Sequence, residues 1–168
     1  VLMDKYGSDS LRMTLCSMAA QGRDIRLSEQ RVEGYRNFIT KIWNAIKFCE
    51  INNCIYKDLK IEEVKHDFNL WIINEFDKCK SITQIAIENY KFNEAANELY
   101  RFTWNIFCDW YLELSKKIYE NNNDTEIIET RNVTSYVLKN ILIMLHPIMP
   151  FFTEYLWKQI SSMLGNSG

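Results

Sequence analysis

Glycine and proline are scarce in this sequence, with five and two residues among 168. Sandwiches and barrels of β-strands need a turn about every ten residues, and such turns rely heavily on these two residue types. Their scarcity argues against those folds, and also against collagen and Pro/Gly-rich disorder. Because 47% of the residues are apolar, the chain is long enough for one sizeable core. We expect one mostly helical domain.

Long apolar runs are also missing. No run approaches the roughly 20 residues of a membrane-spanning helix, and the N-terminus lacks a basic stretch followed by an apolar one. We therefore expect no membrane partner, while the cysteine pattern described below favours a reducing cytoplasm. Because the sequence begins with Val1 and not with Met, we further expect it to be a piece of a larger protein, whose catalytic residues lie elsewhere.

Residues that commonly carry chemistry are few. There is no Gly-rich phosphate loop, no Gly-x-Ser-x-Gly and no His-Glu-x-x-His motif. Of the two histidines, His66 lies in a polar stretch, and His146 precedes Pro147 at a predicted helix end, where a cation favours the helix dipole. We assign no catalytic residue to this chain.

The cysteines are odd in number and never spaced as Cys-x-x-Cys, which argues against a disulfide framework and a zinc ribbon. They are Cys16, Cys49, Cys54, Cys79 and Cys108. They fall at predicted core positions of helices, where free cysteine packs as a small hydrophobe. A metal site shared with the histidines is the alternative, but no metal ligand is predicted.

Apolar residues recur three and four positions apart along most of the chain, which predicts a bundle of about six helices. The expected ranges are 9–20, 28–52, 67–90, 93–119, 125–145 and a last helix from about 150. Ser28 and Asn93 are expected as N-caps, Asn123 and Glu126 have capping-box spacing, and Pro150 suits a first helical position. Asn52-Asn53 is expected to end the second helix.

Two of these helices have informative faces. The buried candidates of helix 67–90 include Leu70, Ile73, Phe76, Ile82, Ile85 and Ala86. Helix 93–119 is apolar around most of its circumference and is expected to be central. Its polar ridge contains Asp109 and Glu113, which are expected to pair with basic residues of neighbouring helices and fix their register. A general acid and base pair is the alternative.

Helix 28–52 has an apolar stripe and a distinct opposite face. The stripe comprises Val32, Tyr35, Ile39, Ile42, Ile46 and Cys49. The opposite face collects Gln30, Asn37, Lys41, Asn44 and Phe48, with Arg36, Thr40 and Lys47 on its flank. An aromatic ring beside amides and cations is what recognition of unstacked RNA bases requires. The alternative is that another segment covers Phe48 and that the lysines are simply solvated.

The charge distribution favours the same helix. The whole chain carries a net charge of -2, which argues against binding nucleic acid through overall charge. Residues 1–60, however, contain 10 Lys and Arg against 7 Asp and Glu, whereas residues 61–168 contain 10 against 15. A local basic excess therefore accompanies helix 28–52. Its cations can follow a phosphate backbone, namely Arg23, Arg26, Arg31, Arg36, Lys41 and Lys47.

Several blocks resemble valyl-tRNA synthetases over nearly all of the chain. They are residues 5–12 (Lys-Tyr-Gly-Ser-Asp-Ser-Leu-Arg), 22–27 (Gly-Arg-Asp-Ile-Arg-Leu), 33–38 (Glu-Gly-Tyr-Arg-Asn-Phe), 41–45 (Lys-Ile-Trp-Asn-Ala), 90–96, 107–113 and 146–151. Some of these blocks also occur loosely in leucyl and methionyl relatives. The joined Gly-Arg-Asp-Ile and Glu-Gly-Tyr-Arg-Asn-Phe blocks are more particular to the valyl enzymes.

The resemblance implies an all-α anticodon-binding bundle of the class I synthetase type. It implies that residues 1–27 connect the bundle to the catalytic half, near the tRNA stem, and that residues 28–168 bind the anticodon stem-loop of tRNA(Val). Domains elsewhere in the parent ligase would use ATP and Mg²⁺ in protein biosynthesis, whereas this chain would hold no cofactor. The same domain of an isoleucyl or leucyl relative is an alternative, as is a helical protein-interaction module.

The resemblance implies that Lys41, Lys47 and Phe48 belong to the helix that meets the anticodon, in agreement with the face identified above. Phe48 is expected to stack on a base, Asn44 and Lys41 to contact base edges or sugars, and Arg36, Lys47 and Arg23 to contact phosphates; Asn37 completes the RNA-binding set. The family often has Arg where this chain has Lys47. Because Lys lacks the bidentate fork of Arg, Lys47 is expected to contact the backbone.

Overall fold

The computed structural model describes residues 2–20, 22, 26–121 and 123–165. Its helices are α1 (Leu2–Tyr6), α2 (Ser8–Met18), α3 (Glu29–Ile51), α4 (Asp67–Glu88), α5 (Phe92–Arg101), η2 (Phe102–Leu112), α6 (Glu113–Tyr119), α7 (Asp124–Leu145) and α8 (Pro150–Gln159), with a short 3-10 turn η1 (Ile61–Glu63). No strand occurs in these described ranges. The predicted all-α class is confirmed, and α1 is a helix that the sequence pattern did not predict.

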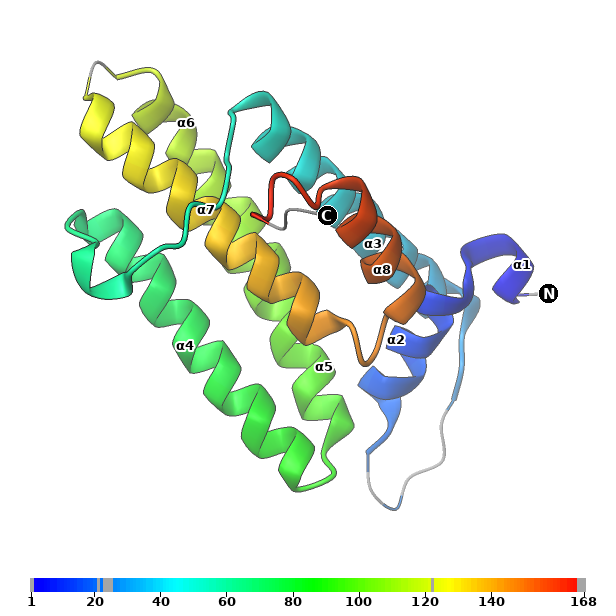
Figure 1. Ribbon diagram of the computed structural model, residues 1–168. Coiled ribbons are helices and arrows are strands. Elements are labelled where there is room, and N and C mark those ends of the chain that lie inside the picture. Colours follow the sequence, from blue (N-terminus) through cyan, green and yellow to red (C-terminus); the bar gives the residue numbers. More distant parts are fainter. Residues whose placement is uncertain (1, 21, 23–25, 122, 166–168) are drawn as a thin grey trace.

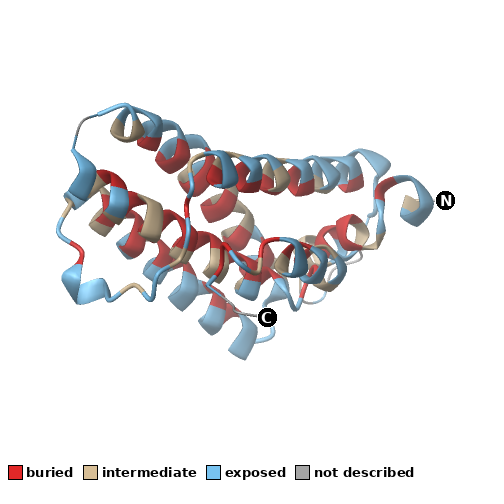
Figure 2. Ribbon diagram, turned by 45° about the horizontal axis from the view of Figure 1, so that its top comes forward, coloured by how far each residue is buried: buried red, intermediate tan, exposed pale blue. Residues whose placement is uncertain are grey.

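The helices form a bundle around one long rod. The segments α5, η2 and α6 follow one another without a break, as Figure 1 shows in green to yellow. Helix α4 packs along α5 and η2, and α7 contacts α4 and α6. On the other side, α3 packs against η2, while α2 contacts α3, α5 and α8. Buried residues gather on the faces that the helices turn toward one another (Figure 2).

Most predicted helix ends are confirmed. The side chain of Asn123 accepts a hydrogen bond from the Glu126 amide at 3.4 Å, and Pro150 occupies the first turn of α8. Helix α3 ends at Ile51, followed by Asn53 with a φ of 55°. Asparagine tolerates this left-handed backbone better than most residues, which explains why the chain turns there.

Two predicted caps need correction. Ser28 is the N-cap of α3, but its side chain makes no capping hydrogen bond. Asn93 was expected as a cap, whereas Lys91 is the N-cap and Asn93 lies inside the first turn of α5. The reason is the preceding turn, in which Tyr90 has a φ of 57° and the Lys91 amide bonds to the Ala86 carbonyl at 2.8 Å. This turn reverses the chain early, so α5 begins one residue before the predicted start.

The predicted helix 93–119 is continuous, but its middle is a π-helix, η2. Its buried side chains come in adjacent pairs at 102–103, 107–108 and 111–112, which are five and then four positions apart. This repeat is wider than the 3.6 residues of an α-helical turn. The prediction that this helix is central is confirmed, since α2, α3, α4 and α7 all pack on it. It is not buried on every side, because Trp110 and Leu114 are exposed.

Two predicted core residues of α4 are also exposed. Ile73, Phe76 and Ala86 are buried as expected, but Ile82 and Ile85 point to solvent. Toward its end α4 packs on α5, with Cys79, Thr83 and Ala86 on the buried face. Ile82 and Ile85 are rotated away from that face and are not covered by the described helices.

A chain of buried polar groups links α4, η2, α6 and α7. The Tyr111 hydroxyl donates to Asn69 Oδ1 at 2.9 Å, and Asn69 Nδ2 donates to Glu129 Oε1 at 2.8 Å. Thr134 Oγ1 lies 3.3 Å from the Tyr111 hydroxyl and 3.2 Å from that of Tyr119. Because each member has a partner, the network fixes the register of these helices without leaving a buried polar group unsatisfied.

Candidate nucleic-acid interface

The described site residues all lie on α3. Arg36 lies beside residues of α1, α2 and α8, whereas Lys41, Asn44 and Phe48 lie beside η2 and α6. Arg36, Asn37, Asn44 and Lys47 are exposed, and Lys41 and Phe48 are half-buried. Arg23 lies outside the described residues, so its predicted role has no structural counterpart here.

A shallow groove of about 180 Å³ runs between α3 and the rod η2–α6. Helix α3 contributes Lys41, Asn44, Ala45 and Phe48, η2 contributes Cys108 and Leu112, and α6 contributes Glu113 and Lys116. Three of the predicted residues, Lys41, Asn44 and Phe48, therefore line one depression. The groove combines an apolar floor with amide, ammonium and carboxylate groups at its edges, so it suits a flat ring with polar edges.

Phe48 is not the uncovered ring that the helical pattern predicted. Its centroid lies 6.2 Å from that of Tyr119, and the Lys116 ammonium lies 5.9 Å from the ring centre. The apolar face of α3 is wider than the predicted stripe, because Phe38 and Ala45 are also buried, and the rod packs beside it. Part of the Phe48 ring is thus supported by α6 and part remains accessible in the groove.

Lys41 is held by an ion pair across the groove. Its Nζ lies 2.6 Å from Asp109 Oδ1 and 5.3 Å from the centre of the Trp104 ring. The hydrogen bond to Asp109 raises the pKa of Lys41, so its positive charge is retained throughout the physiological range. The expectation that Asp109 pairs with a basic residue of a neighbouring helix is confirmed.

Glu113, by contrast, pairs within its own helix. Its Oε2 lies 2.7 Å from Lys116 Nζ, three residues along α6. The prediction that it bridges to another helix is therefore wrong. Lys116 lies three positions further along the same helix face, so it is the nearest cation with which the Glu113 carboxylate pairs.

Lys47 and Arg36 differ in their surroundings. Lys47 Nζ lies 2.8 Å from Glu50 Oε2 and 5.1 Å from the centre of the Trp43 ring. The side chain of Arg36 makes no hydrogen bond or ion pair with the described part of the chain; it lines a second depression together with Phe151 and Tyr155 of α8. An incoming phosphate can therefore reach Arg36 without displacing a carboxylate of the described residues.

Sequence patterns missed the partners that complete these surroundings. Lys116 and Trp104 approach α3 from segments more than 55 positions away, and Tyr155 stacks on Trp43 with centroids 6.3 Å apart. Helical periodicity reports which face of a helix is apolar, but not which helix lies against it. No signal in the sequence identified these neighbours.

Both histidines lie at helix ends. His146 is the C-cap of α7, as predicted, and its Nδ1 lies 2.8 Å from Thr153 Oγ1. His66 precedes α4 as its N-cap. Within the ranges 2–20, 22, 26–121 and 123–165, no group of three His, Cys, Asp or Glu residues is arranged to hold a metal ion. Over the same ranges, none of the helices has the length and apolar character to span a membrane.

Curated relatives that resemble this chain are valine–tRNA ligases. The chain is 54% identical over 160 residues to a valine–tRNA ligase of Zymomonas mobilis, covering 93% of this chain and 18% of the relative. A valine–tRNA ligase of Bartonella quintana is 50% identical over 157 residues, covering 93% and 17%. The chain thus spans under a fifth of the length of these curated relatives.

A solved structure shares the fold. The LeuRS of Agrobacterium radiobacter K84, described as a ternary complex with tRNA and LeuAMS, superposes with a TM-score of 0.68 at 13% identity, covering 99% of this chain and 19% of that one. Residues 69–168 match the family model described as the anticodon-binding domain of tRNA ligase. That match begins at the third residue of α4 and extends through α8, so α3 lies outside it. The chain therefore belongs to the family of anticodon-binding domains of tRNA ligases.

Proposed function

We propose that this chain is the anticodon-binding bundle of a valine–tRNA ligase and that it positions tRNA(Val) for aminoacylation by other domains of the same enzyme. The observation that carries the proposal is the identity of 54% and 50% to two valine–tRNA ligases over 93% of the chain. The remaining synthetase domains are its covalent partners. Valine activation by ATP with Mg²⁺, and transfer of valine to the tRNA, belong to those domains.

The α3 face provides the contact with the anticodon stem-loop. Phe48, supported from behind by Tyr119, presents the rest of its ring to a base in the groove. Asn44 and Lys41 line the same groove and reach base edges or sugars. Arg36, Lys47 and Arg23 contact phosphates, and Asn37, whose side chain is exposed, follows Arg36 along α3.

Binding exchanges the ion pairs of the free protein for contacts with RNA. Lys41 would leave Asp109, and Lys47 would leave Glu50. Both pairs are substantially exposed to solvent, and pairs of this kind contribute only about 0–1 kcal/mol each. Their exchange for contacts with RNA is therefore inexpensive. Asp109 and Glu113 would remain beside the groove, where their negative charges repel phosphate. The groove would therefore favour a base, and the phosphates would lie along its α3 side.

The same proposal divides the chain into two parts. Residues 1–27 connect the bundle to the catalytic half of the parent enzyme, near the tRNA stem, and residues 28–168 form the anticodon-binding bundle. The packing of α2 on α3, α5 and α8, with a hydrogen bond of 2.9 Å from Arg12 Nε to the Ile148 carbonyl, supports a fixed junction between the two parts.

The proposal is tested with Phe48→Ala and Lys41→Ala in the full-length enzyme. Losing a stacked base contact costs about 1–3 kcal/mol, so kcat/KM for tRNA(Val) is expected to fall by about 5- to 150-fold for Phe48→Ala. The matched control is Phe92→Ala, which removes an exposed ring at the start of α5, at the other end of the bundle from the groove. Unchanged aminoacylation kinetics in both α3 variants would overturn the assignment of this face.

Two further measurements separate the alternatives. Charging of tRNA(Val), tRNA(Ile) and tRNA(Leu) by the full-length enzyme distinguishes a valyl enzyme from its relatives, and only tRNA(Val) is expected to accept its amino acid. Binding of tRNA should weaken steeply with salt, because phosphate contacts release counterions. A nearly flat salt dependence would favour the helical protein-interaction module instead.

A further inference from the structure

Helices α3 and α8 share an exposed surface that carries large rings. Trp43 of α3 and Tyr155 of α8 stack with their centroids 6.3 Å apart and their planes 25° apart. Tyr155 is 53% exposed, and Phe151, one turn earlier on the same face of α8, is 68% exposed. We refer to these three rings, together with Arg36 and Lys47 of α3, as the α3–α8 surface.

Two cations lie beside these rings. Arg36 lines a depression of about 260 Å³ together with Phe151 and Tyr155. Its side chain makes no hydrogen bond or ion pair with the described part of the chain. Lys47 Nζ lies 5.1 Å from the centre of the Trp43 ring, and its ion pair with Glu50 is exposed to solvent. Exposed rings for bases, next to cations for phosphates, are the combination that binds single-stranded RNA.

A buried carboxylate lines the same depression. Asp9 of α2 is 5% exposed, and its Oδ2 accepts a hydrogen bond from the Phe152 amide at 2.5 Å. This contact lies at the start of α8, where the helix dipole offsets the negative charge. Asp9 Oδ1 has no hydrogen-bond partner in the described part of the chain. Such an acceptor is uncommon in a folded protein, and it can receive a hydrogen bond from a base amino group or a ribose hydroxyl.

The α3–α8 surface continues the face of α3 that borders the groove. At 100° per residue, the side chains that are not buried form one arc on α3, in the order Trp43, Arg36, Lys47, Thr40, Asn44, Asn37, Phe48 and Lys41. Trp43 at one edge packs on α8, and Phe48 at the other edge packs on α6. The two rings are about 7.5 Å apart along the helix axis. One RNA loop that places a base at Phe48 can therefore reach the α3–α8 surface with a neighbouring nucleotide.

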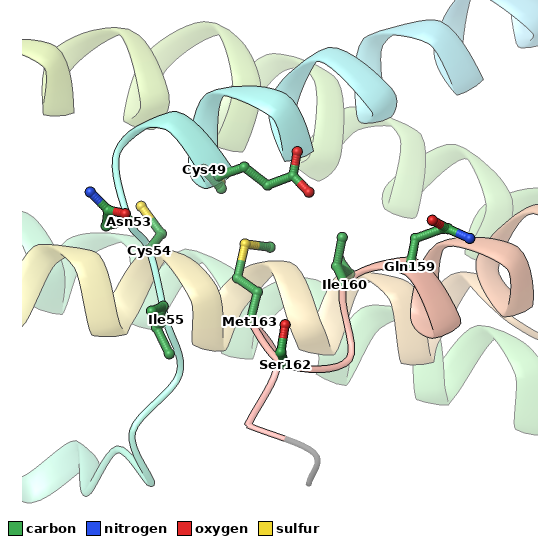
Figure 3. A pocket seen from close by; sticks show the side chains of 9 residues that line it. Cys49, Asn53, Cys54, Ile55, Gln159, Ile160, Ser162 and Met163 are labelled. Atoms are coloured by element: carbon green, nitrogen blue, oxygen red, sulfur yellow. The ribbon is translucent and has the colours of Figure 1, made fainter. Parts of the chain in front are cut away.

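The far end of the junction between α3 and α8 has a different character. A cavity of about 210 Å³ lies there, where Cys54, Ile160 and Met163 gather near Cys49 at the end of α3 (Figure 3). No lysine or arginine of the described residues lines this cavity. Since a phosphate needs a cation, this end is unsuited to RNA. The cations and exposed rings belong to the part of the junction nearer the start of both helices.

We propose that the α3–α8 surface is a second contact for the tRNA, in which an unpaired base stacks on the Tyr155 ring and the adjoining phosphate pairs with Arg36. Trp43 supports the Tyr155 ring from behind, as Tyr119 supports Phe48 at the other edge of α3. The inference rests on the proposed function, because it requires that α3 faces the tRNA. It adds α8 to the elements that contact RNA.

The first test is tRNA(Val) binding by the full-length enzyme, measured by fluorescence titration. Tyr155→Leu keeps apolar cover on Trp43 but removes the ring, so the affinity is expected to fall by about 10-fold, within the range for loss of one stacked base. Phe92→Leu, at an exposed ring of α5, is the matched control and should bind as wild type. Circular dichroism checks that both variants are folded.

Phe48→Ala, measured in parallel, separates this inference from the proposed function. If Phe48→Ala weakens binding and Tyr155→Leu binds as wild type, the contact at the α3–α8 surface is refuted and the proposed function stands. If neither variant weakens binding, the assignment of the whole α3 face to RNA is refuted. If Tyr155→Leu alone weakens binding, the α3–α8 surface is supported and the groove loses its assigned role.

Photo-cross-linking identifies what covers the surface. Tyr155 is replaced by p-benzoylphenylalanine in the full-length enzyme, which is irradiated with and without tRNA(Val) and analysed by mass spectrometry. The expected product is a cross-link to tRNA that is absent when Phe92 is replaced in the same way. A cross-link to a peptide from another domain of the enzyme, formed without tRNA, would show that this domain covers the surface and would overturn the proposal.

Discussion

The two sides of the central rod, formed by α5, η2 and α6, contact the neighbouring helices through different interactions. Toward α3, η2 presents Asp109, which pairs with Lys41 at the rim of an open groove. Toward α4 and α7, the same segment presents Tyr111, which is fully buried and bonded to Asn69. Exposed ion pairs are cheap to exchange, whereas buried hydrogen-bonded groups are costly to separate. The molecule therefore combines a face that can accept a ligand with a face that maintains the bundle.

A substitution in the buried hydrogen bonds between η2, α4 and α7 should have the largest effect on stability. Asn69→Ala removes the partner of the Tyr111 hydroxyl and one donor to Glu129, and leaving such groups unsatisfied costs about 2–3 kcal/mol of local stability. Hydrogen exchange of the α4, η2 and α7 amides in the full-length enzyme measures this loss. The control Asn74→Ala, at an exposed position of the same helix, should change exchange by less than about 0.5 kcal/mol. Equal effects of the two variants would remove the distinction between the two sides.

Changing the ring in the groove tests what the open side recognises. Phe48→Leu keeps apolar packing against Tyr119 but removes the aromatic face, and it is expected to weaken tRNA(Val) binding by about 10-fold. Binding by the full-length enzyme is measured by fluorescence titration. Phe92→Leu is the matched control. If Phe48→Leu binds as tightly as wild type, the ring supports α6 and does not stack on RNA.

Arg36 should contribute through charge alone. Arg36→Gln removes a cation without an ion pair in the described structure, and the slope of log affinity against log salt is expected to become shallower by about 0.7–0.9. The affinity should fall similarly for all tRNA sequences, because a phosphate contact carries no base information. The comparison variant is Lys80→Gln on α4, also exposed, whose salt slope should match wild type. An unchanged slope for Arg36→Gln would exclude it from the phosphate contacts.

Releasing Lys41 should have the smallest effect. Asp109→Asn removes the charge that holds Lys41 and repels phosphate, so tRNA binding is expected to tighten by about 2- to 5-fold, within the range of one exposed ion pair. Glu75→Gln, which releases Lys78 on α4, is the control and should leave binding unchanged. Weaker binding by Asp109→Asn would mean that the ion pair positions Lys41 and does not compete for it.

Much of the fold was predictable because it depends on local chemistry. The stripe of Ile39, Ile42 and Ile46 is buried as its spacing indicated. The N-cap at Asn123 and the proline at the start of α8 were also correctly predicted. The exposure of Ile82 and Ile85 was not predictable, because an apolar residue is buried only where another element packs on it.

The candidate site was predictable only as a list of side chains on one helix. Lys41, Asn44 and Phe48 were placed on a common face, and the structure brings them into one groove. The support of Phe48 by Tyr119 and the pairing of Lys41 with Asp109 join segments far apart in the sequence. The sequence predicted that a carboxylate of the polar ridge pairs with a basic residue of a neighbouring helix, but it did not identify Lys41 as the partner of Asp109. Whether these residues bind RNA stays a prediction.

The sequence by itself determined that this protein is an all-helical bundle with a basic, amide-rich face on α3, because turn residues, helical periodicity and charge are local properties. Only the tertiary structure decided that the rod becomes a π-helix at η2, that α6 covers half of Phe48, and that Cys49 and Cys54 share a cavity. These features arise where distant segments pack on one another, and packing depends on the shapes of both surfaces at once.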